Sequence, residues 1–290
     1  MIGSRYAALF ARLARQGDGA FVPFLTLGDP DRNTSAELLP VLIDAGADAL
    51  ELGLPFSDPV ADGPVIQAAA TRALAAGATL DGCLDLIRAA RAHAPDVPIG
   101  ILGYANLAWH RGLDRFARDL ERAGADSILL ADVPLEEGEP FRRAARDHGL
   151  AQVLILPPNA DDRRLAAIAA ATEGFTYVTT RSGVTGEHGG PEPTLAGTLE
   201  RLRAHGSAPP VIGFGISTPV HAREGIAAGA AGVIAGSAVV RRIERHREDP
   251  ARLRSELQAY VRSMKEATRG IGHPAGVEPA PGSGGRGAAR

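Results

Sequence analysis

The sequence predicts a single (β/α)8 (TIM) barrel with extra N-terminal and C-terminal helices. Three observations favour this fold: eight short apolar runs, helical patterns between them, and an Ala-Gly-Ala element that recurs between a helix and the next strand. Strands and helices that alternate at this spacing indicate βαβ units around a parallel sheet, and eight units in about 250 residues are typical of the barrel. An open doubly wound sheet is the alternative, but Thr26–Pro30 after the first strand lacks the G-x-G-x-x-G turn.

Each expected strand is a short, mostly apolar run that leads into a loop. In chain order the strands are Phe21–Leu27, Ala49–Leu52, Ile99–Leu102, Ser127–Ala131, Gln152–Leu156, Thr176–Thr179, Val211–Phe214 and Gly232–Ala235. The intervening helices repeat apolar residues at three- and four-residue spacing. They are expected at Thr34–Ala45, Val65–Ala75, Leu80–Ala94, Leu113–Ala123, Pro140–His148, Asp162–Ala171, Thr194–His205, Pro219–Ala228 and Ala251–Thr268. The glycine of each Ala-Gly-Ala element suits the left-handed position that ends a helix.

Composition limits the class of protein. The chain has 290 residues, 45% of them hydrophobic, and a net charge of −3, which gives no electrostatic case for a nucleic-acid partner. No apolar run is long enough to span a membrane, and no signal-peptide pattern is present, so the expected location is the cytoplasm. Residues 1–269 form the predicted catalytic barrel. Residues 270–290, rich in Gly, Pro and Ala, are expected to be a disordered tail.

Residue types that hold cofactors are scarce. One cysteine, Cys83, leaves no disulfide or cysteine-rich metal site, and the eight histidines show no metal-ligand spacing, so no metal is expected. Of the 31 basic residues all but Lys265 are arginine. Lys265 falls in the pattern of a surface helix, which leaves almost no candidate for a lysine Schiff base.

Two carboxylates stand where packing alone would not place them. Glu51 interrupts an apolar strand, and strand alternation puts it on the face of Ala49 and Gly53, pointing into the barrel mouth. Loss of solvation there raises the pKa of a carboxyl and suits it to acid–base chemistry; pairing with a barrel arginine is the alternative. Asp62 follows in the proline-rich loop Pro55–Pro64. Two carboxylates in different surroundings can serve as an acid and a base.

Glycine-rich loops after the last strands predict a phosphate site. Gly213–Ser217 ends the seventh strand, and Gly236-Ser237 ends the eighth and opens the short helical pattern Ala238–Arg245. Backbone N–H groups at a helix N-terminus bind anions, and barrels of this class often hold phosphate at this place. Ser182–Gly186 is expected to add donors. The longer segment Ser182–Pro193 has the composition of a lid that excludes water, or simply of a surface loop.

Six segments carry recognisable motifs in one order along the chain. They are Phe21–Pro30, Leu50–Gln67, Tyr104–Leu107, Ala131–Pro134, Arg181–Gly186 and Gly213–Ser217. In this order, between about Tyr6 and Arg269, they resemble the tryptophan synthase alpha subunit family. The segment around Glu51 and Asp62 is long and highly specific.

The resemblance implies a lyase that cleaves indole-3-glycerol phosphate to indole and glyceraldehyde 3-phosphate in a retro-aldol reaction. By similarity, Glu51 protonates the indole ring carbon and helps to remove the hydroxyl proton. Asp62 binds the indole N–H, and Tyr177 helps to position the reacting groups. No cofactor is expected, because protonated indole is itself the electron sink that such a cleavage needs.

The resemblance also assigns the residues beside the substrate. Those expected to line the indole pocket are Phe24, Ile66, Leu102, Tyr104, Leu129 and Phe214. Thr185 is expected next to the substrate, and its phosphate is expected on backbone groups of Gly186, Gly215, Gly236 and Ser237.

The family works in an alpha2beta2 complex, in which the beta subunit carries pyridoxal phosphate and receives the indole. Asp58 and the segment Asn106–Gly112, which includes Trp109, match the surface that meets beta. From the residues alone, Asp58 also fits a turn or a helix cap. Trp109, the only tryptophan, is either a partner anchor or a buried side chain.

Three other functions fit part of these observations. A free-standing lyase would release indole quickly without a beta subunit. A non-catalytic subunit would only activate beta, and the presence of Glu51, Asp62 and Tyr177 argues against it. An unrelated phosphosugar isomerase on the same fold is disfavoured by the loop Pro55–Gly63, because fold alone does not fix function.

Overall fold

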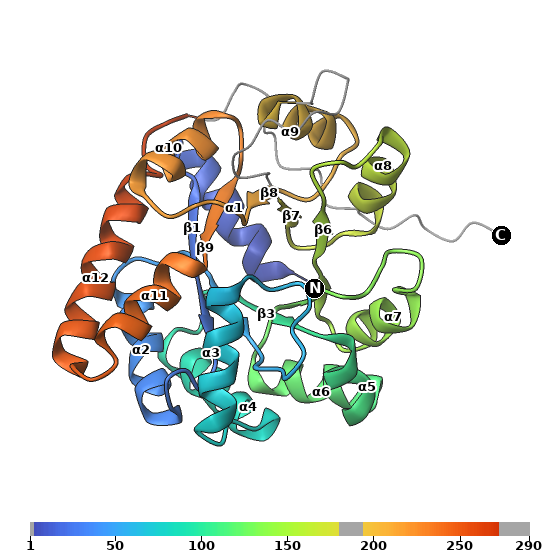
Figure 1. Ribbon diagram of the computed structural model, residues 1–290. Helices are drawn as coiled ribbons and strands as arrows, with labels where there is room; N and C mark the ends of the chain where they lie inside the picture. The colour runs from blue at the N-terminus through green and yellow to red at the C-terminus, as the bar shows by residue number, and fades with distance from the viewer. Residues whose placement is uncertain (1–2, 180–193, 273–290) are drawn as a thin grey trace.

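The structure is a computed structural model that describes residues 3–179 and 194–272. Within these ranges, nine strands form one parallel sheet in the order β5-β4-β3-β2-β1-β9-β8-β7-β6. The sheet curls into a barrel with the helices around it (Figure 1). The predicted (β/α)8 barrel is confirmed, and the open doubly wound sheet is excluded.

The strands lie within a residue or two of their expected positions. They are β1 (Ala20–Thr26), β2 (Leu50–Gly53), β3 (Ile99–Gly103), β4 (Ser127–Leu130), β5 (Ala151–Gln152), β6 (Leu154–Leu156), β7 (Thr176–Val178), β8 (Pro210–Ile212) and β9 (Gly232–Ala235). The fifth expected strand is divided in two at Val153, where the backbone N–H of Leu154 donates to the Thr172 hydroxyl at 3.0 Å. β5 pairs with β4, and β6 pairs with β7, so β5 and β6 are the two edges of the sheet. The chain passes directly from one edge to the other at Val153, and this brings the two edges of the barrel together.

The described ranges hold twelve helices, and most of them follow the predicted pattern. They are α1 (Ser4–Gln16), α2 (Arg32–Asp44), α3 (Pro64–Ala75), α4 (Leu80–His93), α5 (Ala105–Arg111), α6 (Leu113–Ala123), α7 (Glu139–Asp147), α8 (Asp162–Ala171), α9 (Leu195–Ala204), α10 (Pro219–Ala227), α11 (Ser237–His246) and α12 (Pro250–Glu266). The sequence did not predict α5, whose seven residues are too few to show a helical period.

The recurring Ala-Gly-Ala elements end helices as expected. Gly46, Gly124 and Gly229 have φ values of 107°, 98° and 104°. Only glycine adopts this left-handed region without strain, so these residues allow the chain to leave a helix and enter the next strand.

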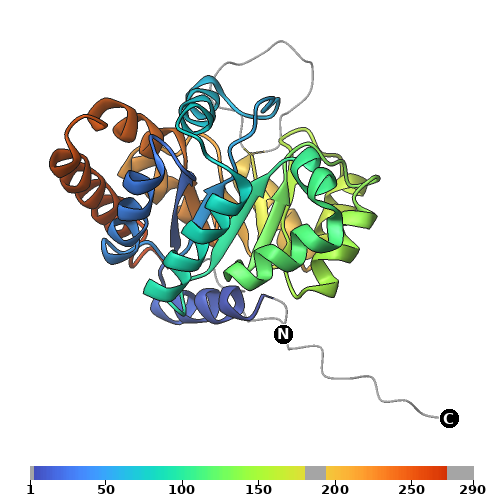
Figure 2. The ribbon, with the colours of Figure 1, turned by 90° about the horizontal axis from the view of Figure 1, so that it is seen from below.

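Two apolar layers hold the barrel together. Outward-facing strand residues such as Leu50 and Leu52 pack against the surrounding helices. Inward-facing residues such as Val22, Ala49 and Phe175 fill the barrel interior together with Tyr6 of α1. Figure 2 shows α1 lying across the bottom of the barrel, where it covers the N-terminal ends of the strands. The opposite end of the barrel, where the strands have their C-terminal ends, is not covered by α1 and is left for a functional site.

Lys265 was expected on a surface helix, and that expectation was wrong, because the residue is buried. Only 7% of its surface is exposed. Its Nζ lies 2.8 Å from Oδ2 of Asp48 and donates to the Gly19 carbonyl at 3.1 Å. The face of α12 that carries Lys265 packs onto the barrel, and Asp48 supplies the counter-charge that a buried ammonium requires. Gly19 precedes β1, so the single lysine lies at the end of the barrel away from the C-terminal strand ends.

The last described residues still contact the barrel. Gly270 donates its N–H to Asp18 at 2.9 Å, Gly272 donates to the Gly17 carbonyl at 3.1 Å, and Ile271 packs against the core. The rest of the expected tail and the expected lid, residues 182–193, lie outside the described residues, so both remain predictions. No helix of the described ranges is long and apolar enough to cross a membrane.

Candidate active site

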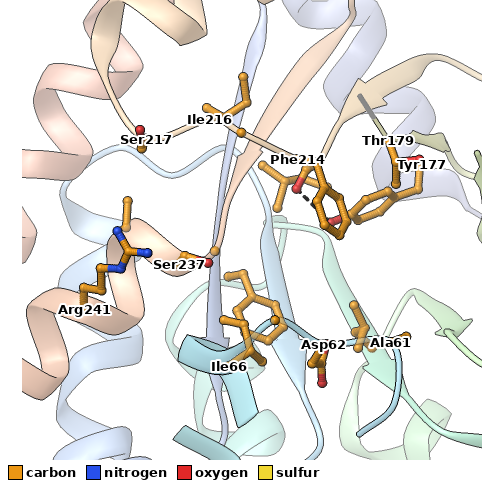
Figure 3. Close-up of a pocket in the computed structure, with 18 of the residues that line it drawn as sticks. Ala61, Asp62, Ile66, Tyr177, Thr179, Phe214, Ile216, Ser217, Ser237 and Arg241 are labelled. Atoms are coloured by element: carbon orange, nitrogen blue, oxygen red, sulfur yellow. Dashed lines mark hydrogen bonds between the residues drawn. The ribbon is translucent and has the colours of Figure 1, made fainter. Parts of the chain in front are cut away.

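A cavity of about 670 Å³ opens at the C-terminal ends of the strands. Its walls come from β1, β3, β6, β7 and β9 and from the loops that follow β2, β4 and β8 (Figure 3). Function in this fold is carried at this end.

Most of the expected substrate residues line this cavity. They are Phe24, Asp62, Ile66, Leu102, Tyr177, Phe214, Gly215, Gly236 and Ser237. Leu129 and Tyr104 are buried instead of lining it: Leu129 packs in the barrel interior, and the Tyr104 hydroxyl accepts the N–H of Ala61 at 3.2 Å. Thr185 and Gly186 lie outside the described residues.

Glu51 lies on β2 with only 3% of its surface exposed. Its Oε2 has no hydrogen-bond partner among the described residues, and none of the arginines in residues 3–179 and 194–272 forms an ion pair with it. Glu51 borders a second, smaller cavity of about 10 Å³ with Tyr6, Phe10 and Gly100, deeper in the barrel than the main one. Burial, with a contribution from the neighbouring Asp62, raises the pKa of Glu51 to about 8. The carboxyl is therefore protonated at neutral pH.

Asp62 projects from the loop between β2 and α3. Its N–H donates to the Pro59 carbonyl at 3.0 Å, and the Gln67 side chain donates to its backbone carbonyl at 2.8 Å. Burial raises the pKa of Asp62, while a hydrogen bond from Tyr104 opposes that rise. The fixed loop thus holds a half-buried carboxyl at the cavity wall (Figure 3).

Tyr177 comes from β7 and lies across the cavity from Ile66 (Figure 3). Its hydroxyl donates to the Gly213 carbonyl at 3.2 Å. Burial and the nearby Glu51 and Asp62 carboxyls raise the pKa of Tyr177 well above its ordinary value, so it remains a neutral hydrogen-bond donor. A Cβ on Gly213 would overlap the Tyr177 ring, which explains the glycine at this position.

The other end of the cavity is suited to an anion. Gly236 is the N-cap of α11 and provides no side-chain cap, so the first N–H groups of the helix stay available. Gly215, with φ 79°, turns the loop after β8 toward the same end. Arg241, Arg242 and Arg245 of α11 also line the cavity, and the sequence analysis missed them. Their spacing after Ser237 was the signal that could have identified them.

The residues expected to meet a partner lie on the surface. Asp58 and Asn106 are exposed. Trp109 is 66% exposed and contacts the ring of Phe141, with 6.2 Å between ring centres, so it is not a buried side chain. Val60, in the same loop as Asp58, is also exposed.

The resemblance to one family extends over most of the chain. The family model described as Tryptophan synthase alpha chain matches residues 10–269. The chain belongs to this family. The resemblance inferred from the motifs is thereby confirmed.

Individual alpha chains are similar over their full length. The tryptophan synthase alpha chain of Serratia proteamaculans (strain 568) is 50% identical over 265 residues, 91% of this chain and 99% of the relative. That of Klebsiella pneumoniae (strain 342) is 51% identical over 91% of this chain and 98% of the relative. The solved tryptophan synthase subunit alpha of Legionella pneumophila str. Paris has a TM-score of 0.80 at 32% identity, covering 91% and 98%.

As a tryptophan synthase alpha chain, the protein is a lyase of tryptophan biosynthesis. It cleaves indole-3-glycerol phosphate to indole and glyceraldehyde 3-phosphate, and the indole passes to a beta subunit. The phosphosugar isomerase and the non-catalytic activator are therefore excluded.

The raised pKa of Glu51 has a consequence for stability. We expect Glu51→Gln to be more stable than the parent at pH 9, and the difference to shrink toward pH 5. A carboxyl whose pKa is about 8 when folded, against an ordinary value of 4.5, takes up a proton on folding between these two pH values. The favourable contribution of this proton to the free energy of unfolding is complete below pH 4.5 and is lost as the pH rises through 8. Glutamine does not titrate, so the variant has no such loss.

Urea unfolding of both proteins at pH 5, 7 and 9 measures this difference in the free energy of unfolding. Glu224→Gln, which changes an exposed carboxyl of α10, serves as the matched control. Equal pH dependence in the parent and in Glu51→Gln would show that Glu51 is not buried as an acid.

Proposed function

We propose that Glu51 is the acid–base residue of the cleavage, that Asp62 binds the indole nitrogen and that Tyr177 positions the reacting groups. The observation that carries this assignment is the buried, protonated Glu51 carboxyl beneath a cavity whose wall holds a second carboxyl, Asp62. A protonated acid and a nearby carboxylate are the two groups that a retro-aldol cleavage of this substrate needs.

The proton of Glu51 goes to C3 of the indole ring, and the ring becomes cationic. Asp62 accepts a hydrogen bond from the indole N–H and stabilises that cation. The C3–C bond to the side chain then breaks, its electrons return to the ring, and the adjacent hydroxyl becomes the aldehyde. The hydroxyl proton returns to the Glu51 carboxylate, so the acid is regenerated.

For this role the Glu51 side chain has to turn from the lower cavity toward the main one. Both Asp62 and Tyr177 are near enough to interact electrostatically with Glu51. A turn about the side-chain torsions is a small change compared with a movement of β2, and substrate binding would favour it by placing a basic ring carbon above the carboxyl.

The substrate phosphate is proposed to bind backbone N–H groups of Gly215, Gly236 and Ser237, together with Gly186 and the neighbouring Thr185. The bare N-terminus of α11 and the turn at Gly215 support this assignment. Phe24, Ile66, Leu102 and Phe214 would then contact the indole ring from the apolar part of the cavity.

No cofactor of the chain's own is proposed. The indole ring accepts the electrons that a lysine imine or a metal would otherwise accept, and Lys265 is held by Asp48 at the far end of the barrel. Pyridoxal phosphate is proposed only on the beta subunit, in an alpha2beta2 complex in the cytoplasm.

Trp109, Asp58 and Asn106 are proposed as contacts with that beta subunit. We expect slow indole release by the chain alone and a strong increase when a tryptophan synthase beta subunit is added. Trp109→Ala should weaken the apparent affinity for beta about tenfold, because an exposed aromatic anchor commonly contributes more than about 1 kcal/mol to an interface. The measurement is indole release as a function of beta concentration.

Val220→Ala, which removes an exposed apolar side chain from α10, is the control for this experiment. Fast release that beta does not change would favour a free-standing lyase and contradict the proposed interface. Equal affinity of the Trp109→Ala variant and the parent for beta would remove Trp109 from the interface.

A further inference from the structure

One wall of the cavity carries a concentration of positive charge. Arg241, Arg242 and Arg245 of α11 line the cavity together with Gly236 and Ser237 at the start of the same helix. Among residues 3–179 and 194–272, no ion pair includes any of these three arginines. They therefore carry charge that no described carboxylate neutralises.

Arg242 is fixed in place before any ligand arrives. Its Cζ lies 3.7 Å from the centre of the Tyr260 ring, and its Nη1 donates to the Ala238 carbonyl at 2.7 Å. The Tyr260 hydroxyl donates in turn to the Ser217 carbonyl at 3.2 Å. Tyr260 of α12 thus links Arg242 to the loop after β8, and both Arg242 and Ser217 line the cavity.

Arg241 lies more in the open. Its side chain is exposed, and Figure 3 shows its guanidinium on the side of the cavity where Ser217 and Ser237 lie. A flexible exposed cation beside a fixed, half-buried one can approach an anion from a second direction.

The backbone donors do not balance the charge of a phosphate. A helix N-terminus provides the equivalent of about half an elementary charge, whereas a phosphomonoester at neutral pH carries about −1.5 to −2. Guanidinium groups supply the remaining charge and bind phosphate oxygens through strong, charge-assisted hydrogen bonds.

We propose that Arg241 and Arg242 form a cationic clamp on the substrate phosphate and make the site selective for a phosphomonoester dianion. The clamp rests on the proposed function, because it requires the phosphate to bind at the N-terminus of α11. Arg242 is the preoriented half and Arg241 the mobile half. Arg245, one turn further along the helix, adds charge at the rim.

Steady-state kinetics with indole-3-glycerol phosphate test the clamp. In Arg242→Gln we expect KM to rise about tenfold, the effect of one charged hydrogen bond. Arg241→Gln should show a smaller increase because its side chain is exposed, and the double variant the largest. We expect kcat to change little, since the phosphate contact is the same in the ground state and the transition state. Arg242→Lys, which keeps the charge but loses the planar stacking, should lie between Arg242→Gln and the parent.

A second readout separates binding from structural damage. Glycerol 3-phosphate carries the phosphate without the indole, and calorimetry measures its affinity at low and high salt. The parent's affinity should fall as salt rises, and the double variant should bind weakly with a much flatter salt dependence. Arg262→Gln removes an exposed arginine of α12 that does not line the cavity, and it should behave as the parent.

The outcomes distinguish the clamp from the proposed phosphate site. If the parent binds glycerol 3-phosphate and the double variant binds it with the same affinity and salt dependence, the clamp is wrong and the backbone site stands. If the parent does not bind glycerol 3-phosphate, both are wrong. Selective weakening of glycerol 3-phosphate in the Arg241 and Arg242 variants, with Arg262→Gln unchanged, supports the clamp.

Discussion

Glu51→Gln is expected to lower the rate of indole release from indole-3-glycerol phosphate by at least about 10²- to 10⁴-fold, the range that acid–base catalysis contributes. Glutamine has nearly the same shape as a protonated glutamic acid but cannot transfer its proton. The Oε2 of Glu51 makes no hydrogen bond that the substitution would break. The barrel should therefore remain folded while the chemistry is lost.

Indole formation at saturating substrate measures the effect, and circular dichroism with thermal unfolding checks the fold. Asp62→Asn should also lower kcat, because a neutral amide no longer stabilises the indole cation. In the parent, the rate should decline as the pH rises through about 8, where Glu51 loses its proton. Retained turnover in Glu51→Gln would overturn the catalytic assignment, and Glu224→Gln controls for the loss of a carboxyl elsewhere.

The sequence identified the catalytic end because its signals were local. Glu51 interrupts an apolar strand, and the two-residue period of a strand was enough to place it on the inner face of the barrel. Its expected position at the barrel mouth was wrong, because Glu51 borders the smaller cavity beside α1 and does not line the main one. The glycine-rich ends of β8 and β9 followed from the geometry of the fold, and both line the cavity.

Other features depend on contacts between distant parts of the chain. Lys265 has the pattern of a surface residue until Asp48, more than two hundred positions earlier in the sequence, is brought beside it. The fixed position of Arg242 requires Tyr260 of α12 and Ser217 of the loop after β8. Likewise, alternation gives the face of Glu51 but not that its side chain borders the smaller cavity, which Tyr6 and Phe10 of α1 also line.

Arg72→Met is expected to lower the free energy of unfolding by about 3–5 kcal/mol at neutral pH, the cost of leaving a buried charge without its partner. Asp29, after β1, is 0% exposed. Arg72 of α3 binds it with two hydrogen bonds, from Nε at 2.8 Å and from Nη2 at 3.0 Å. Methionine fills much of the arginine volume but leaves the Asp29 carboxylate without either bond.

The loss of stability should shrink as the pH falls. Burial already raises the pKa of Asp29, and Arg72 opposes that rise. Without the arginine, the pKa should rise further, so the carboxyl takes up a proton in acid and no longer carries an unpaired charge. Asp29→Asn in the Arg72→Met background removes the charge altogether and should restore part of the stability, which a double-mutant cycle in urea would measure.

The same ion pair also ties together the two ends of the site. Arg72 makes a third contact, from Nη1 to Oε1 of Glu244 at 3.1 Å, so α3, which follows the Asp62 loop, is fixed to α11, which begins at Ser237. Arg72→Met should therefore lower kcat/KM as well as stability.

The control variant is Arg254→Met, which breaks an exposed ion pair with Glu37. It should lower the free energy of unfolding by no more than about 1 kcal/mol. Equal costs for the two substitutions would mean that burial of Asp29 adds nothing, and the link between α3 and α11 would lose its physical basis.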